Sequence, residues 1–224
     1  RHKDIKNGLS APPKLTAKSL ANMMTKVRWG LGMLGTRRRE FRNVVGHAKG
    51  VSDPGSLAKW TAEAFDPSLD WEKIRQFRKM WDGPVIIKGI MDARDAREAV
   101  NIGADAIVVS NHGGRQLDGA LSSIRALPEI VEAVGDKIEV HLDSGIRTGQ
   151  DILKALAMGA KGVMVGRAFV YGLGAMGEMG VTRALEILQK ELETSMALCG
   201  RTDVNDLDRD ILLVPEGFSG RWES

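Results

Sequence analysis

Two stretches of the chain repeat one pattern, a Gly-Ala turn that leads into a short apolar run. They are "GADAIVVS", which begins at Gly103, and "GAKGVMVG", which begins 56 residues later at Gly159. A helix that ends at a glycine and leads directly into a buried strand is the repeating unit of folds in which helices alternate with parallel strands. The repeat therefore predicts an α/β fold with a parallel sheet.

Four apolar runs fit the strands of this sheet, because they are rich in valine and isoleucine, as doubly buried parallel strands are. The runs cover residues 84–89, 106–110, 138–143 and 162–166, and each ends in a polar or glycine-rich turn. Helix start and stop signals stand between the runs. The expected helices run from Asp92 to near Gly103, from Ser122 or Ser123 to about Ala133, and from Thr148 to Gly159.

Two architectures accommodate such units. A doubly wound open sheet is one, but its Gly-x-Gly-x-x-Gly phosphate turn is absent from the chain. The other is a (β/α)8 TIM barrel, which needs eight strands and typically ~250 residues. Since residues 1–83 contain no four further units, we expect this chain to carry the second half of the barrel, strands five to eight. The exposed strand edges of a half-barrel would need covering, so we expect the other half in another segment or chain.

The remaining segments are expected to differ from the barrel units. We predict that residues 1–83 form a loop or insertion after the fourth strand, with a candidate membrane-associating segment and connecting helices. Residues 84–210 should form the half-barrel, and residues 211–224 an extended tail. One or two amphipathic helices are expected between Phe169 and Leu198, with a break near Gly180.

The composition excludes several classes of protein. The net charge of +3 is small, and we expect no nucleic-acid partner. A single cysteine excludes an internal disulfide and fits a reducing compartment, and the four scattered histidines suggest no metal site. No apolar run approaches the ~20 residues that span a bilayer, and no signal peptide opens the chain. We therefore expect a cytoplasmic protein.

Cationic side chains and glycines follow the predicted strands, where parallel α/β folds bind their ligands. Lys88 lies near the end of the first run, and a lysine at the end of a buried strand needs a negatively polarised partner, which a ligand would supply. "DSGIRTG", from Asp143, and "GR", at Gly166, supply arginines, backbone N–H groups and a helix N-terminus, which suit a phosphate. The alternative is a structural ion pair between Asp143 and Arg147.

The stretch "VVSNHGGRQLDG" places His112 and Arg115 on a glycine-rich turn after the second run. Arginine is suited to a bidentate grip on a carboxylate. Histidine is suited to act as a base near neutral pH. A lone loop histidine is more often a surface residue, but Gly113, Gly114 and the buried strand before them favour a functional site.

These motifs resemble those of the FMN-dependent α-hydroxy acid dehydrogenases and oxidases, the family of glycolate oxidase, mandelate dehydrogenase and bacterial L-lactate dehydrogenases. "SNHGGRQLDG" resembles the family's active-site signature, "VIIKG" its flavin-facing lysine strand, and "LDSGIRTG" and "VMVGRAF" its FMN phosphate loops. The opening "RHKDIKNGLSAPP" is similar to the segment after the family's fourth strand. The resemblance covers about residues 1 to 210, with the motifs in the family's order.

The resemblance implies roles for individual residues. It makes His112 the base that takes a proton from the substrate, and Arg115 and Arg1 the residues that bind the substrate carboxylate. The implied cofactor is FMN, held by Lys88, Ser110, Asp143, Ser144, Gly145, Arg147, Gly166 and Arg167. Since the family's first half supplies further active-site groups, we expect these 224 residues alone to be catalytically incomplete.

The implied reaction is the oxidation of an L-2-hydroxy acid, with L-lactate ahead of mandelate and glycolate, to the 2-oxo acid. Electrons would pass from FMN to a quinone or another acceptor. One alternative is a soluble oxidase that uses O2 and produces H2O2. Another is a phosphate- or FMN-binding half-barrel without catalysis. The family also implies a homo-oligomer, a tetramer.

Residues 16–45 mix leucine, methionine and tryptophan with several basic residues. In some members of the family such a segment docks on the inner membrane, so the resemblance implies peripheral contact with the cytoplasmic face of that membrane. The alternative is a mobile active-site lid with solvated charges. Gly30, Gly32 and Gly35 weaken the prediction of a helix in this segment.

Overall fold

The computed structural model describes residues 16–35, 56, 60–61, 63–64 and 66–218. The chain divides into two compact units, Arg1–Leu69 and Asp70–Ser224. The second unit contains the strands and the candidate site. The division into residues 1–83, 84–210 and 211–224 that we predicted from the sequence remains a prediction.

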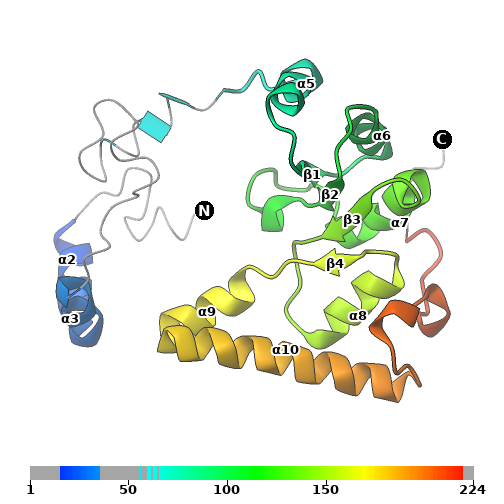
Figure 1. The fold of residues 1–224 in the computed structure, drawn as a ribbon. Coiled ribbons are helices and arrows are strands. Elements are labelled where there is room, and N and C mark those ends of the chain that lie inside the picture. Colours follow the sequence, from blue (N-terminus) through cyan, green and yellow to red (C-terminus); the bar gives the residue numbers. More distant parts are fainter. Residues whose placement is uncertain (1–15, 36–55, 57–59, 62, 65, 219–224) are drawn as a thin grey trace. The chain divides into compact units, whose positions relative to one another are not determined.

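A four-stranded parallel sheet lies at the centre of the second unit (Figure 1). Its strands are β1 (Ile86–Ile90), β2 (Ala106–Val109), β3 (Glu139–Leu142) and β4 (Gly162–Val163), in that spatial order. Every neighbouring pair is parallel, and the register joins Lys88 to Val108 and Val108 to His141. The strand order follows the chain order, as expected when each strand is joined to the next by a crossover helix.

The crossover helices follow the predicted signals closely. They are α6 (Ala93–Asn101), α7 (Ser123–Val134) and α8 (Gly149–Ala157). The Asp92 side chain accepts a hydrogen bond from the Arg94 N–H and so caps α6. Thr148 caps α8 in a reciprocal box with Asp151. The local sequence therefore fixes where these helices begin.

Two further helices follow β4. They are α9 (Arg167–Met176) and α10 (Glu178–Leu198), and the break between them falls at Gly177, with φ 64°, rather than near Gly180. Gly180 instead allows a close approach, because a Cβ there would lie 1.9 Å from the Gly172 carbonyl oxygen. The unit is completed by α5 (Trp71–Met80) and the 3-10 turns η1 (His112–Gly114), η2 (Val204–Asp206) and η3 (Arg209–Ile211).

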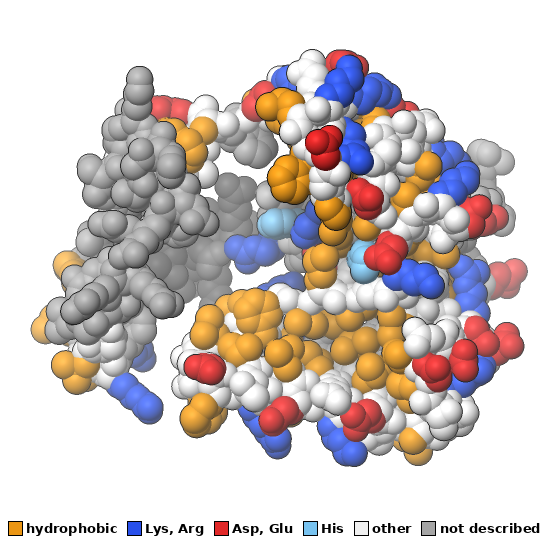
Figure 2. Space-filling view, in the orientation of Figure 1, with side chains coloured by type: hydrophobic (Ala, Val, Ile, Leu, Met, Phe, Trp, Pro, Cys, Tyr) orange, Lys and Arg blue, Asp and Glu red, His pale blue; other side chains and the backbone are white. Residues whose placement is uncertain are grey.

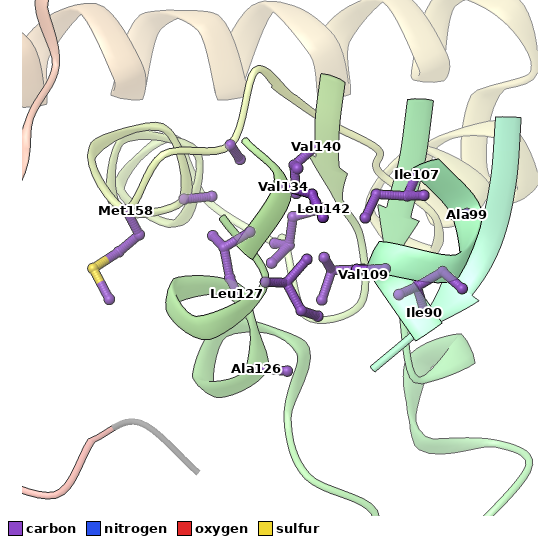
Figure 3. Packing of buried hydrophobic residues seen from close by; sticks show 14 of the residues in the cluster. Ile90, Ala99, Ile107, Val109, Ala126, Leu127, Val134, Val140, Leu142 and Met158 are labelled. Atoms are coloured by element: carbon purple, nitrogen blue, oxygen red, sulfur yellow. The ribbon is translucent and has the colours of Figure 1, made fainter. Parts of the chain in front are cut away.

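The core fills the space between the sheet and its crossover helices (Figure 3). Ile107 and Val109 from β2, and Val140 and Leu142 from β3, pack against Leu127 and Val134 of α7, and all six are buried. Since side chains alternate along a strand, Glu139 and His141 point to the opposite face of β3 from Val140 and Leu142. The helix-covered face of β3 is therefore sealed by apolar residues and its other face carries the polar ones, whereas β2 is apolar and buried on both faces.

Within the described residues, β1 pairs only with β2 and β4 only with β3, so both edges of the sheet are open. Large apolar side chains are exposed beside these edges, including Ile86 in β1 and Met164 just after β4. Figure 2 shows hydrophobic side chains gathered over the region of α9 and α10, where Tyr171 is 72% exposed. A closed barrel would cover such edges with further strands.

The described part of the first unit contains α2 (Ala17–Met24) and α3 (Val27–Gly35). The second of these is helical despite its three glycines, and the Gly30 N–H donates to the Lys26 carbonyl at 2.9 Å. Each glycine weakens a helix by about 1 kcal/mol but does not forbid it. Among the described residues, no helix has the length and apolar character needed to cross a membrane.

Candidate active site

The end of β2 leads into a tightly held turn that carries His112. The Ser110 hydroxyl oxygen accepts a hydrogen bond from the His112 N–H at 3.1 Å, and the Asn111 side chain accepts one from the Gly114 N–H at 3.0 Å. Gly113 and Gly114 adopt φ values of 68° and 69°, which glycine reaches without strain. This is the structural reason for the two glycines after the histidine.

Lys88, in the middle of β1, reaches with its side chain toward the ends of β2 and β3. Its ammonium group donates to the Ser110 hydroxyl at 2.6 Å and forms an ion pair with the Asp143 carboxylate at the end of β3. From the sequence we expect a ligand as the partner of Lys88, whereas the structure supplies two protein partners, Ser110 and Asp143. Asp143 is therefore paired with Lys88 rather than with Arg147 in the described structure.

The environment of Asp143 keeps its carboxyl group ionised. Burial alone would raise the pKa of this group, but hydrogen bonds from Lys88, Ser110 and Ser144, together with the charge of Lys88, outweigh burial. The net effect lowers the pKa of Asp143 below its ordinary value of 3.8. A fixed negative charge thus stands among the cations of this edge.

This lowered pKa predicts how stability depends on pH. Because the carboxyl pKa is lower in the folded than in the unfolded state, the charge stabilises the fold above the unfolded pKa of about 3.9. That contribution disappears as the pH falls through the folded pKa. Replacing Asp143 by Asn should therefore lower the free energy of unfolding by about 1–3 kcal/mol at pH 7, with a difference that shrinks progressively as the pH falls below the unfolded pKa. Urea denaturation of both proteins measures this, and a pH-independent difference would contradict it.

The loops after β3 and β4 supply the remaining predicted groups. Ile146 is buried and anchors the first loop, while Gly145 and Arg147 on either side of it are exposed. A Cβ added to Gly145 or Gly166 would meet no atom within 4 Å, so both glycines border open space. Gly166 is also the N-cap of α9 and provides no side-chain cap, which leaves first-turn N–H groups for a ligand.

One cavity of ≈ 360 Å³ joins these strand ends. Nine of the predicted site residues line it, namely Lys88, His112, Arg115, Asp143, Ser144, Gly145, Arg147, Gly166 and Arg167. Ser110 is buried and does not line the cavity itself, but its hydroxyl accepts a hydrogen bond from Lys88, which does. The predicted substrate residue Arg1 lies outside the described residues. Among the charged residues of the lining, four cations surround one carboxylate, which favours an anionic ligand.

Among the described residues, two non-glycine residues have a positive φ. They are His112 at 56° and Ser144 at 72°, and both belong to this site. Such conformations cost on the order of 1–3 kcal/mol for a side-chain-bearing residue and concentrate at functional sites. Histidine tolerates the left-handed region better than most residues. The two strained residues therefore lie on turns that also line the cavity.

Ser123 is predicted from the sequence only as a possible helix start, but in the structure it also holds the backbone of the loop after β3. Ser123 is 1% exposed, and its hydroxyl donates to the carbonyls of Asp143 and Ser144 at 2.6 and 3.0 Å. The sequence offered one signal for this role, namely a small polar residue at the start of the helix that follows the His112 turn. Met164 and Val165, which also line the cavity, carried no signal beyond their place at a strand end.

The residues at this edge fit FMN. Arg147, Arg167 and the uncapped start of α9 suit a phosphate, and the open space beside Gly145 and Gly166 leaves room for it. Asp143 and Lys88 offer an acceptor and a cation farther along the same cavity. The donor set thus matches a ligand with a phosphate at one end and polar groups along its length.

Comparison with known proteins gives matches along almost the whole chain. A family model described as FMN-dependent dehydrogenase matches residues 1–214. The chain is 44% identical over 216 residues to an L-lactate dehydrogenase of Caulobacter vibrioides and 46% identical over 215 residues to one of Azorhizobium caulinodans. Each match covers 95% of this chain, but only 55% and 56% of these relatives. The chain therefore spans about half the length of the curated relatives it matches.

Solved structures agree with the sequence matches. A crystal structure of (S)-mandelate dehydrogenase, described as a monotopic membrane protein, superposes with a TM-score of 0.87 at 35% identity. The superposition covers 95% of this chain and 56% of that protein. The four parallel strands are thus half of the barrel of FMN-dependent TIM-barrel enzymes, which confirms the predicted fold class.

Proposed function

Because this chain belongs to the FMN-dependent dehydrogenase family, whose cofactor is FMN, we propose that its protein oxidises an L-2-hydroxy acid to the 2-oxo acid. L-Lactate is the proposed substrate, since the L-lactate dehydrogenases above are more similar in sequence than the mandelate dehydrogenase. The observation that carries the proposal is that His112 and Arg115 line the same cavity as the phosphate-type loops. The complete reaction needs the remainder of the barrel.

The side chains of the cavity have complementary tasks in this reaction. Arg115 binds the substrate carboxylate through its guanidinium fork and so orients the reacting carbon. His112 accepts the proton that the substrate loses, while the α-hydroxyl becomes a carbonyl. FMN, when bound, supplies the two-electron acceptor. Arg1 is proposed as a second carboxylate ligand.

The residues proposed to hold FMN fall into three groups. Arg147, Gly166 and Arg167 bind the phosphate, and Ser144 and Gly145 contribute backbone N–H groups to the same end. Asp143 binds the polar chain between phosphate and ring, which its retained negative charge suits. Lys88 and Ser110 would hold the ring, and the lysine would there stabilise negative charge on the flavin.

A substrate panel tests this function. Anaerobic addition of L-lactate to the FMN-loaded protein should bleach the flavin absorbance, and mandelate and glycolate should do so more slowly. Bound flavin that no 2-hydroxy acid bleaches would instead support a non-catalytic FMN-binding protein. Reoxidation by quinone but not by O2 would support a dehydrogenase, whereas rapid O2 consumption with H2O2 formation would identify an oxidase.

We further propose that α2 and α3 lie on the cytoplasmic face of the inner membrane, close to a quinone acceptor. Leu20, Met24, Val27 and Leu31 are exposed, and basic residues such as Lys26 stand among them. This combination suits the interface of an anionic bilayer. The monotopic mandelate dehydrogenase supports the idea by likeness. The family resemblance likewise supports a homotetramer.

Vesicle flotation tests the membrane proposal. Replacing both Leu20 and Leu31 by Glu should lower binding to vesicles that contain anionic lipid by at least about tenfold, since burying one leucine side chain contributes about 1.5–3 kcal/mol. Leu198→Glu, an exposed leucine on α10, is the matched control and should bind normally. Equal binding by all three proteins would remove α2 and α3 from the interface.

A further inference from the structure

The Ser144 side chain joins two loops of the site. Its hydroxyl oxygen accepts a hydrogen bond from the Gly113 N–H at 2.8 Å, and its hydroxyl proton is donated to the Asp143 carboxylate at 2.6 Å. Gly113 directly follows His112, and Asp143 directly follows β3. We propose that Ser144 is a positioning residue that holds the His112 turn in register with the cofactor loop, a role that rests on the proposed function for its chemical consequence.

The backbone at Ser144 supports this role. Its φ of 72° lies in the left-handed region, which glycine adopts freely and which costs a serine free energy. Glycine would therefore adopt the backbone conformation of this turn at a lower free-energy cost than serine. What serine adds is its hydroxyl, and both hydrogen bonds of that hydroxyl lie within the site.

Neighbouring contacts show that Gly113 is held from two directions, through its N–H and through its carbonyl. Ser144 binds the N–H of Gly113, and the Arg167 guanidinium donates to the Gly113 carbonyl at 3.3 Å. Ser123 fixes Ser144 itself, because its buried hydroxyl donates to the Ser144 carbonyl at 3.0 Å. The loop after β3 and the first residue of α9 thus both bind the residue next to His112.

Loss of this bridge should misplace His112 without emptying the cofactor site. Gly113 and Gly114 follow the histidine, and glycines give a released turn many alternative conformations. Proton transfer requires the base within about 2.6–3.2 Å of the proton's heavy atom. A displacement of about 1 Å in such a group costs on the order of 100-fold in rate.

Two substitutions separate the hydroxyl from the backbone. Ser144→Ala removes the hydroxyl and keeps the demanding φ, whereas Ser144→Gly removes the hydroxyl and relieves the backbone. L-Lactate should reduce the flavin of both FMN-loaded variants at least about tenfold more slowly, with kcat lowered more than KM is raised. FMN affinity should stay close to that of the unchanged protein, because both variants keep the Ser144 backbone N–H that is proposed to hold the cofactor. Ser195→Ala is the control, since the Ser195 hydroxyl bonds only the Glu191 carbonyl within α10 in the described structure, and it should retain full rate. A Ser144→Gly variant that works at the normal rate would overturn the proposal.

Hydrogen exchange supplies a readout that does not depend on activity. The Gly113 amide of the FMN-loaded protein should exchange about 2- to 10-fold faster in both Ser144 variants than in Ser195→Ala, as expected for loss of one hydrogen bond. Unchanged exchange at Gly113 would show that Ser144 does not hold the turn. If no 2-hydroxy acid reduces the flavin, the proposed function fails, but the exchange measurement still tests the bridge.

Discussion

Replacing His112 by glutamine is expected to leave FMN bound and to slow flavin reduction by L-lactate about 10²- to 10⁴-fold, the usual contribution of a positioned base. The imidazole lines the cavity on a turn held through Ser110 and Asn111. A glutamine amide occupies similar space and forms hydrogen bonds, but it does not accept a proton near neutral pH. Anaerobic stopped-flow absorbance measures the change.

A second variant controls for the unusual backbone at His112. Since φ at this residue is 56°, a substitution can also disturb the turn. Asparagine tolerates this region better than most residues, so His112→Asn tests the loss of the base with less backbone strain. Both variants should bind FMN normally and react slowly. Reduction at the normal rate by either one would remove His112 from the role of base.

Replacing Arg115 by methionine should lower kcat/KM for L-lactate about 10- to 100-fold, because one or two charge-assisted hydrogen bonds to the carboxylate are lost. Methionine retains much of the length and the apolar stem of arginine, so the change isolates the guanidinium group. Steady-state kinetics with an artificial electron acceptor measure the loss, with FMN content as the control.

A lysine at the same position refines the test of Arg115. Arg115→Lys keeps the positive charge but lacks the fork that binds both carboxylate oxygens, and its kcat/KM should fall between those of the methionine variant and the unchanged protein. A larger effect on KM than on kcat would show binding of the substrate before reaction. Unchanged kinetics in both variants would exclude carboxylate recognition by Arg115.

Much of the half-barrel follows from local sequence rules. Continuous apolar runs and capping residues such as Asp92 and Thr148 act within a few residues of their own position, so strands and helix starts could be predicted from them. The break between α9 and α10 was predicted, but it falls at Gly177, three residues before Gly180, because any of several glycines could end a helix. Only packing, such as the close approach of Gly172 and Gly180, decides which glycine serves which purpose.

The sequence was enough to predict which strand ends form the candidate site, but not which of its side chains are hydrogen-bonded to one another. Parallel topology alone brings Lys88, His112 and Asp143 to one edge, which is why their shared cavity could be expected. The partners of Lys88 depend on register and side-chain direction, which the sequence does not reveal. The Ser144 bridge to Gly113 depends on two left-handed turns meeting across 31 positions of the chain.

A crystal structure of the FMN-loaded protein with the 2-oxo acid pyruvate bound tests the central claim most directly. The account predicts the phosphate between the loops of Gly145 and Gly166, the pyruvate carboxylate on the Arg115 guanidinium, and the His112 ring within hydrogen-bonding reach of the 2-oxo oxygen. A flavin bound away from the ends of β1–β4, or pyruvate beyond the reach of both side chains, would contradict it.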